Sequence, residues 1–349
     1  MKKSILKASF IAALTIFVSC NDDDTDVVVA PTNPVVENEI VGVITENVKL
    51  DQDNYTLTGS YVVPAGKTLT IEAGVNINAI PGDGVSSFET NIVIEKGGKI
   101  VVNGTAAAPV VISSPDAEAA DWGGLIICGK AITSAGTDVA FEVGGYLYGG
   151  TAADDNSGTI NYLVVKGSGA QIDSESQSNG ISFCAVGSGT IISNVSVVNG
   201  GDDGVEFYGG SVSLENVYLE NNLDDAIDWT ESWNGSVTNA YIYHNVAGFS
   251  TVFEGDKDNA IPTFTNITAI SNFDGTALQF KKESGGTITN LYLEGYSVEI
   301  DFKDNGAHSN VKIDGDAAVI KDDNTLSKGM LDYTKGTKVD ISGWDWATK

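Results

Sequence analysis

Short segments that alternate apolar and polar residues recur along this chain from about residue 55 almost to its end. Alternation places successive side chains on opposite faces of a strand. No stretch shows the i, i+3, i+4 apolar spacing of a helix over three turns. The pattern therefore predicts an all-β fold built from many short strands, of which the first are residues 55–58, 59–63, 68–71, 91–94 and 99–102.

One asparagine recurs in the second half of the chain, with a spacing of about 22 residues that is typical of solenoid repeats. Apolar residues lie two positions before the asparagine and one and three positions after it. The inward-facing positions are therefore even-numbered before the asparagine and odd-numbered after it, counted from the asparagine, so the alternation shifts by one residue there. A bend with a residue near the left-handed region explains that shift, because Asn tolerates this conformation better than any residue except Gly. The predicted column is Asn161, Asn194, Asn216, Asn239, Asn266, Asn290 and Asn310.

A second column consists of triplets whose outer members are mostly apolar. The outer members are expected to point into the core, where their aromatic rings stack, and the middle residues to point outward in one file. Parallel rungs lie about 4.8 Å apart, so neighbouring middle residues should be in contact. The predicted outward file is Ser182, Glu206, Asp228, Val252, Gln279 and Glu299.

These repeats predict one single-stranded right-handed parallel β-helix with end caps, spanning residues 41–349. Residues 131–157 break the rhythm with Gly-, Ser- and Asp-rich sequence and are expected to form a loop extruded from the solenoid. A solenoid must cover both open ends. We expect residues 41–70 to cover one end, and Trp344 and Trp346 to cover the other.

An asparagine column at a sharp bend, stacked from rung to rung, resembles the asparagine ladder of pectate-lyase-type right-handed β-helices. The stretches YVVPAGKTLTIEAG, DWGGLIICGKA, GGDDGVEFYGG and LDDAIDW together resemble a family of secreted Bacteroidota-type β-helix lipoproteins. The resemblance covers about residues 55–346. It implies the fold and implies little about an activity.

The N-terminus reads as a targeting signal. Lysines precede an apolar segment that is too short to span a bilayer, and the segment ends in Phe17-Val18-Ser19-Cys20, which resembles a bacterial lipobox. Residues 1–19 are thus predicted to be a signal peptide and Cys20 to carry lipid. Residues 20–40, which begin with the acidic run Asn21-Asp22-Asp23-Asp24, are expected to be a flexible tether. The expected location is the outer membrane, exposed at the cell surface.

The net charge and the cysteines limit the classes of binding partner and of site. The net charge is −28, with 47 acidic residues against 19 basic ones. Nucleic acids and anionic membranes require a basic surface, so neither is expected as a partner, and the membrane is reached only through the lipid. Cys128 and Cys184 lie in apolar runs without metal-type spacing, which favours buried free thiols over a redox or metal site. The alternative is a disulfide, which an oxidising compartment would permit.

The main candidate site is a set of acids at matching positions of two adjacent repeats. Stacked carboxylates repel one another unless a cation or a proton compensates them. Calcium binds six to eight oxygen ligands, and adjacent Asp-Asp turns supply several. The predicted Ca²⁺ ligands are Asp202, Asp203, Glu206, Asp224, Asp225 and Asp228. The alternative is that these acids cap their own turns.

Catalysis is a second possibility for the same cluster. Polygalacturonase-like β-helix glycosidases carry an Asp-Asp pair, and an inverting hydrolase needs two carboxyls about 6.5–9.5 Å apart. Asp203 with Asp225 or Asp228 is the candidate pair, and Lys281 is the candidate base of a lyase. The Gly-His-Gly and Arg-Ile-Lys signatures of those glycosidases are missing, and the chain contains no arginine.

Binding is the rival function. Aromatic side chains at outward positions offer flat faces to sugars and rigid anchors to proteins, and a solenoid presents them along a continuous face. The candidates are Tyr208, Trp233, Tyr218, Tyr241 and Tyr292. The sequence thus predicts a surface lipoprotein that binds an extended ligand, either a glycan or a surface protein, with Ca²⁺ as the candidate cofactor. The alternative is a polysaccharide lyase or glycoside hydrolase.

Overall fold

The computed structural model describes residues 35–36, 38–81, 90–172, 176–258, 260–322 and 325–349. The predicted signal peptide, Cys20 and most of the predicted tether lie outside these residues. Within the described part of the chain, strands dominate, and no helix is long and apolar enough to cross a bilayer. Residues 33–349 form one compact unit.

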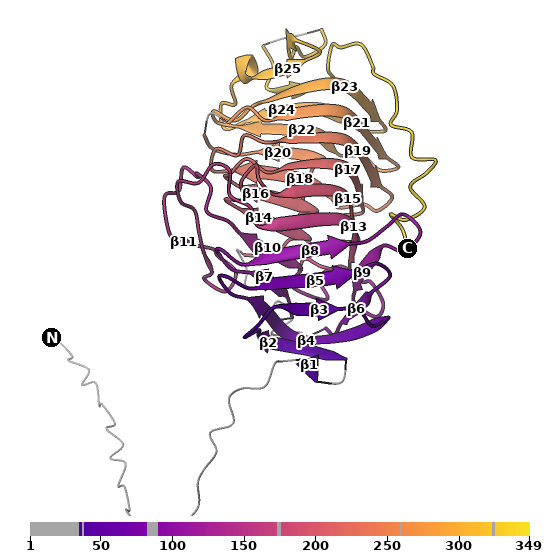
Figure 1. Cartoon of the computed structure of the whole chain (residues 1–349). Coiled ribbons are helices and arrows are strands. Elements are labelled where there is room, and N and C mark those ends of the chain that lie inside the picture. Colours follow the sequence, from indigo (N-terminus) through magenta and orange to yellow (C-terminus); the bar gives the residue numbers. More distant parts are fainter. Residues whose placement is uncertain (1–34, 37, 82–89, 173–175, 259, 323–324) are drawn as a thin grey trace, which may run out of the picture. The chain divides into compact units, whose positions relative to one another are not determined.

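The strands stack into a coil whose rungs lie one above another from β1 to β25 (Figure 1). One continuous sheet joins 25 strands, and nearly all the pairings are parallel. This arrangement confirms the predicted parallel β-helix. Its core is a column of buried Ile, Val, Leu and Phe side chains that runs through every rung.

One file of short strands carries the candidate site, and we call it the site file. It starts with the end of β2 (Glu39–Val43) and the second half of β4 (Asn54–Val63). It continues through β7 (Ile92–Ile94), β10 (Leu125–Cys128), β14 (Ile181–Cys184), β16 (Val205–Tyr208), β18 (Ile227–Thr230), β20 (Phe253–Gly255), β22 (Thr276–Lys281) and β24 (Val298–Lys303).

Two further files form the other sides of the coil. In the first rungs they are separate strands: β3 (Val48–Leu50), β5 (Thr68–Glu72) and β8 (Lys99–Asn103) in one, and β2 (Glu39–Val43), β6 (Asn76–Ala79) and β9 (Val110–Ser113) in the other. From there on, one bent strand serves both files: β13 (Gly158–Lys166), β15 (Ile191–Val198), β17 (Ser213–Glu220), β19 (Ser236–His244), β21 (Thr263–Ser271) and β23 (Gly286–Glu294), followed by the short β25 (Val311–Ile313).

The bend is the predicted asparagine ladder. Five of the predicted asparagines adopt φ between 56° and 58° (Asn194, Asn216, Asn239, Asn266 and Asn290). Each donates a side-chain hydrogen bond of 2.7–3.0 Å to the amide oxygen of the preceding ladder residue, ending at Asn161. The ladder therefore turns each strand and links neighbouring rungs.

Two members of the predicted column are wrong. Asn161 accepts the first ladder bond, but the bend residue opposite Asn194 is Tyr162, with φ 52°. Asn310 belongs to the 3₁₀ turn η2 (His308–Asn310) and donates to the carbonyl of Glu283 instead. At that rung Asp314 is the residue that bonds to the last ladder asparagine, because its carboxylate accepts the backbone N–H of Asn290 at 2.9 Å.

The ends of the coil are covered differently from the prediction. The C-terminal end is closed by η2, β26 (Asp316–Ala317) and β27 (Lys328–Gly329), and Ile320 and Leu331 are buried there. The terminal tryptophans do not cap it. Residues 332–349, which we call the C-terminal strap, run back along the outside of the coil to the level of β13 (Figure 1). At the other end β1 (Val35–Val36) pairs antiparallel with β2.

The loop at 131–157 folds back onto the site file. It contains the hairpin β11 (Val139–Ala140) and β12 (Leu147–Tyr148). Phe141 and Tyr148 are buried against Ile126, Cys184 and Tyr208 on the outer face of the strands. Cys128 and Cys184 pair in register on adjacent rungs, both as buried free thiols, which confirms the prediction.

Candidate functional site

The outward residues of the site file stack in register on consecutive rungs. Glu206 on β16 pairs with Asp228 on β18, which pairs with Glu254 on β20. Three carboxylates thus follow one another at the strand spacing of about 4.8 Å. From β14 to β24 the outward residues of the file are Ser182, Glu206, Asp228, Glu254, Gln279 and Asp301.

Two expected members of this file, Val252 and Glu299, are wrong by two residues. Ile227 pairs with Phe253 instead of Thr251, which brings Glu254 into the file, and Leu278 pairs with Ile300, which brings in Asp301. The inward glycine explains the first shift: a Cβ on Gly255 would lie 2.6 Å from the Trp229 ring, so the indole fills the space that a phenylalanine takes in other rungs. The sequence alignment missed Glu254 because it matched Phe253 with Trp229. A glycine paired with a tryptophan, as in Gly255 and Trp229, is the sequence signal that could have found it.

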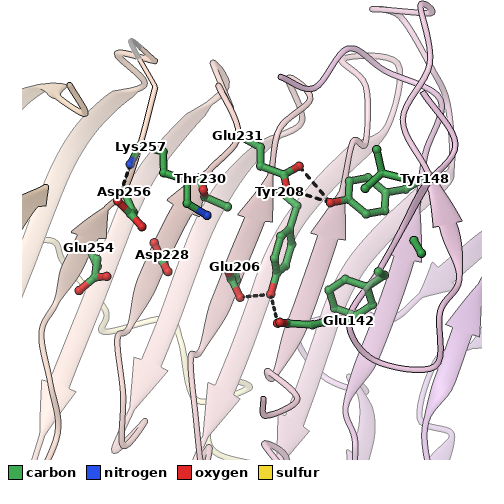
Figure 2. Close-up of a pocket in the computed structure, with 13 residues that line it drawn as sticks. Glu142, Tyr148, Glu206, Tyr208, Asp228, Thr230, Glu231, Glu254, Asp256 and Lys257 are labelled. Atoms are coloured by element: carbon green, nitrogen blue, oxygen red, sulfur yellow. Dashed lines mark hydrogen bonds between the residues drawn. The ribbon is translucent and has the colours of Figure 1, made fainter. Parts of the chain in front are cut away.

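A cavity of about 340 Å³ opens on this file (Figure 2). Its floor is the strand face with Glu206, Asp228 and Glu254, and the hairpin forms one wall. Further carboxylates line it from the hairpin and from the turns that follow the strands, namely Glu142, Glu231 and Asp256. The cavity is therefore strongly acidic, and Lys257 is the basic residue in its lining.

Glu206 is held at the bottom of the cavity by neutral donors. Asn179 Nδ2 donates to its carboxylate at 2.6 Å, and Tyr208 Oη donates to the same oxygen. Tyr208 Oη also lies 3.1 Å from Glu142 Oε1 on the hairpin, although one hydroxyl has only one proton to donate. Burial raises the pKa of Glu206 to about 8, although the two donors act in the opposite direction.

Asp228 has the least compensated carboxylate of the three. Its Oδ1 atom is buried and has no hydrogen-bond partner among the described residues. Burial, followed by the charges of Glu206, Asp225 and Glu254, raises the pKa of Asp228 well above its usual range. The neighbouring Thr230, 7% exposed, also has a buried hydroxyl without a partner there.

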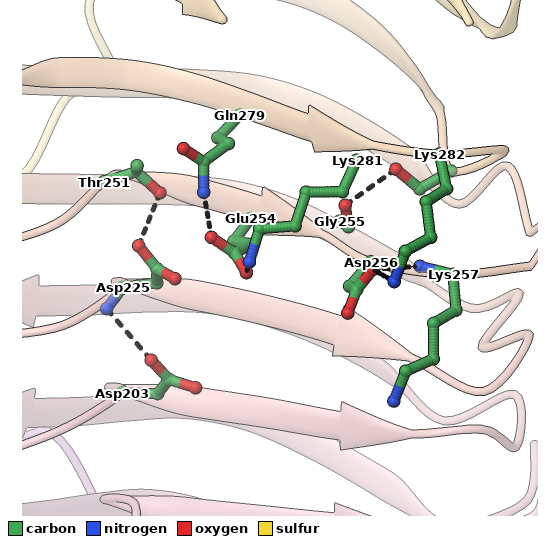
Figure 3. Close-up of polar contacts among 11 residues, drawn as sticks. Asp203, Asp225, Thr251, Glu254, Gly255, Asp256, Lys257, Gln279, Lys281 and Lys282 are labelled. Atoms are coloured by element: carbon green, nitrogen blue, oxygen red, sulfur yellow. Dashed lines mark hydrogen bonds and ion pairs between the residues drawn. The ribbon is translucent and has the colours of Figure 1, made fainter. Parts of the chain in front are cut away.

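Glu254 is compensated from the next rung. Lys281 Nζ forms an ion pair with it, and Gln279 Nε2 donates to its other oxygen (Figure 3). Beside it, Asp256 accepts from Lys282 Nζ at 3.0 Å. Lys281, the candidate lyase base, is thus engaged with a residue that the sequence reasoning missed.

The Asp-Asp turns lie at the other end of these strands and do not line the cavity. Asp203 Oδ1 accepts the backbone N–H of Asp225 at 2.9 Å, and Asp225 Oδ1 accepts the hydroxyl of Thr251 at 2.6 Å (Figure 3). Both aspartates are buried. Burial raises the pKa of Asp225 to about 8 and that of Asp203 well above its usual range. One oxygen of each is thus bonded to the next rung, so the expectation that these acids cap their own turns is wrong for Asp203 and Asp225.

Carboxylates nevertheless converge closely enough for a metal ion. Among the described residues, three groups have one oxygen each within 4.8 Å of one another: Asp202, Asp203 and Asp224; Asp203, Glu206 and Asp228; and Asp225, Asp228 and Glu254. Two ligands of one Ca²⁺ ion, each about 2.3–2.6 Å from it, lie at most about 5 Å apart. The unpartnered Asp228 oxygen also fits a cation ligand. The donor set is therefore compatible with Ca²⁺, and all six predicted ligands take part in these groups.

One of the two predicted catalytic pairs is closer than expected. One oxygen of Asp203 and one of Asp228 lie within 4.8 Å of each other. An inverting hydrolase needs carboxyls about 6.5–9.5 Å apart, with a water molecule between them. Of the proposed carboxylates, only Asp228 lines the cavity.

The aromatic residues predicted to bind ligand are mostly covered. Trp233 is fully buried and stacks on Phe207 with ring centroids 4.0 Å apart, so its expected exposure is wrong. Tyr208 lines the cavity but is 8% exposed, and its hydroxyl serves the carboxylates. Trp233 therefore belongs to the core and Tyr208 to the wall of the cavity, and the two do not form an exposed aromatic surface.

The other three tyrosines lie on the bent strands under the C-terminal strap. Tyr218 and Tyr241 stack with centroids 5.9 Å apart, and Tyr218 is 8% exposed beneath Trp346. Tyr292 lies under the ammonium groups of Lys335 and Lys338, 4.4 Å and 4.8 Å from its ring centre. The strap thus occupies the face that the sequence offered to a ligand.

The family profile described as the pectate-lyase like beta helix domain matches residues 42–340. The chain belongs to this family. A comparison with curated proteins gives no match. Membership agrees with the coil and the ladder, and it suits a protein that handles polysaccharides, but it names no ligand and no reaction.

Proposed function

We propose that this member of the pectate-lyase-like β-helix family is a surface-exposed lipoprotein that binds an extended glycan along the site file. The observation that carries the proposal is the row of Glu206, Asp228 and Glu254, which lines one open cavity on three consecutive rungs. Carboxyl groups accept hydrogen bonds from sugar hydroxyls in either protonation state. A row parallel to the coil axis meets successive sugar units of a chain.

A glycan array followed by calorimetry tests binding. Glu206→Gln should weaken binding of the selected glycan about tenfold, because an amide NH₂ group that cannot accept replaces one oxygen of the carboxyl group, a change worth about 1.4 kcal/mol. Glu118→Gln is the matched control, since Glu118 is exposed and does not line the cavity. Equal affinity of both variants, or an array without any bound glycan, contradicts the proposal.

Calcium is proposed at the turn group formed by Asp202, Asp203 and Asp224. Asp202 is half-buried and Asp224 is exposed, so an ion can enter there and keep water ligands. Burial, followed by the charge of Asp224, raises the pKa of Asp202 to about 7, and a bound cation would relieve that repulsion. Calcium titration should raise Tm, and Asp224→Asn should abolish most of the rise. A Tm that is unaffected by calcium rules the site out.

The membrane anchor is proposed at Cys20, on the strength of the lipobox-like sequence before it. Metabolic labelling with a fatty acid and protease shaving of intact cells test the anchor and its exposure. Cys20→Ala should remove the label and release the protein from the membrane fraction. A labelled Cys20→Ala variant contradicts the assignment.

A polysaccharide lyase or glycoside hydrolase is the second candidate. The observation in its favour is that Asp228, whose pKa is raised, lies beside Glu254, whose carboxylate is paired with Lys281. An acid that keeps its proton beside a carboxylate is the arrangement of general acid–base catalysis. Reducing-sugar and unsaturated-uronate assays on bound glycans separate the two functions, since binding alone gives no product.

A further inference from the structure

Lys281 shows how the protein itself compensates one carboxylate of the site file. It lies two residues after Gln279, the rung neighbour of Glu254, and its ammonium group pairs with the Glu254 carboxylate. The ammonium group therefore reaches the carboxylate diagonally, from the next rung (Figure 3).

The two preceding carboxylates lack this partner. Two residues after Glu254, the rung neighbour of Asp228, the chain has Asp256. Two residues after Asp228, the rung neighbour of Glu206, it has Thr230. At the positions equivalent to Lys281, the chain thus offers another carboxylate and a hydroxyl.

The cavity lies at these uncompensated positions. Asp228 Oδ1 and the hydroxyl of Thr230 are buried, lack partners within the described part of the chain, and belong to residues of the lining. Lys257 also lines the cavity, but it is exposed and forms no ion pair with a described residue. Burial without a counter-ion favours the neutral, protonated form of these acids, whereas a cation stabilises their charged form, so a ligand that supplies a cation gains more here than a neutral one.

We infer that this cavity binds a protonated primary amine, so that the ligand is a glycan carrying free amino groups. An ammonium group has three donors and no acceptor, and Glu206, Asp228 and Thr230 offer acceptors on two adjacent rungs. The net charge of −28 attracts such a ligand at long range. A volume of about 340 Å³ suits a small group or one sugar ring.

The inference rests on the proposed glycan binding and narrows it to one chemical class. Calorimetry on the full-length protein should compare an oligomer of β-1,4-linked glucosamine with its N-acetylated counterpart, at a pH where the amine is protonated. The amine oligomer should bind at least about tenfold more tightly, a difference of about 1.4 kcal/mol. Acetylation removes the charge and leaves the chain length unchanged.

Variants locate the preference in the cavity. Asp228→Asn should remove most of the preference, whereas Asp116→Asn, the same change at an exposed residue outside the lining, should leave it intact. Thr230 stands to Glu206 as Lys281 stands to Glu254, so a lysine introduced by Thr230→Lys should pair with Glu206. This substitution should therefore abolish amine binding. Thr230→Lys adds a charge pair instead of removing a buried group, which keeps the test valid if Asp228→Asn fails to fold.

The results distinguish a failure of the amine inference from a failure of the proposed glycan binding. Equal affinity for both oligomers overturns the amine inference and leaves glycan binding standing. Binding of the amine oligomer that Thr230→Lys does not change also overturns the inference, since the amine then binds elsewhere. Failure of every glycan on the array, neutral or amine-bearing, overturns the proposed function itself.

Discussion

Asp203 Oδ1 accepts the backbone N–H of Asp225 on the next rung at 2.9 Å, and both residues are buried. A side chain of one Asp-Asp turn therefore satisfies a backbone N–H group of the Asp-Asp turn on the next rung. The position needs an acceptor, whereas a negative charge is unfavourable there, because burial raises the pKa of Asp203.

Two substitutions at Asp203 separate the acceptor from the charge. Asp203→Ala should lower the free energy of unfolding by about 1–3 kcal/mol, because the N–H of Asp225 loses its partner. Asp203→Asn keeps an acceptor and removes the charge, so it should be neutral or stabilising without calcium. Urea denaturation in EDTA measures both. Equal destabilisation by the two variants would show that the charge itself is needed.

The pH dependence of stability follows from the raised pKa values. Burial raises the pKa of Glu206 from 4.5 to about 8 and that of Asp225 from 3.8 to about 8. Because the folded state holds these protons more tightly than the unfolded state, stability is greatest below the unfolded values and falls as pH rises toward about 8. Without calcium, Tm should therefore decrease over this window.

A double variant checks the origin of that decrease. Glu206→Gln combined with Asp225→Asn should flatten the slope of Tm against pH in EDTA, since neither amide titrates. The matched pair Glu118→Gln and Asp116→Asn, both at exposed residues, should keep the original slope. A slope that persists in the double variant assigns it to other groups.

Asn239 lies in the middle of the ladder, with φ 58° and side-chain bonds to Asn216 and Asn266 of 3.0 and 2.8 Å. Asn239→Ala should cost about 2–5 kcal/mol, because it removes both bonds and because Ala tolerates the left-handed region less well than Asn does. Asn239→Gly removes the bonds alone and should cost about 1–3 kcal/mol. Thermal and urea unfolding compare them. A larger loss with Gly contradicts the role of the bend.

The C-terminal strap is anchored by Trp346, which is 2% exposed and packs edge-on against Tyr162 at 5.3 Å. Trp346→Ala should weaken this anchor by about 3 kcal/mol and release the end of the strap. Limited proteolysis should then cleave within residues 332–349 much faster. Trp344→Ala, at the half-buried neighbour, is the control and should change cleavage little. Unchanged cleavage in Trp346→Ala means that the strap is held elsewhere.

The sequence by itself determined the coil. A side-chain period of two, broken at regular intervals by a residue that tolerates the left-handed region, specifies short strands and their bends, and parallel stacking then brings Glu206 beside Asp228. Local chemistry is sufficient for this because each rung repeats the same few backbone conformations.

Only the tertiary structure decided which residues surround the carboxylates. The turns between strands vary in length, so the file gained Glu254 and Asp301 where alternation pointed to Val252 and Glu299. The fit of Trp229 against Gly255 set that register. The hairpin that walls the cavity and the strap that covers the tyrosines come from distant segments, and no periodicity within a rung records where such segments pack.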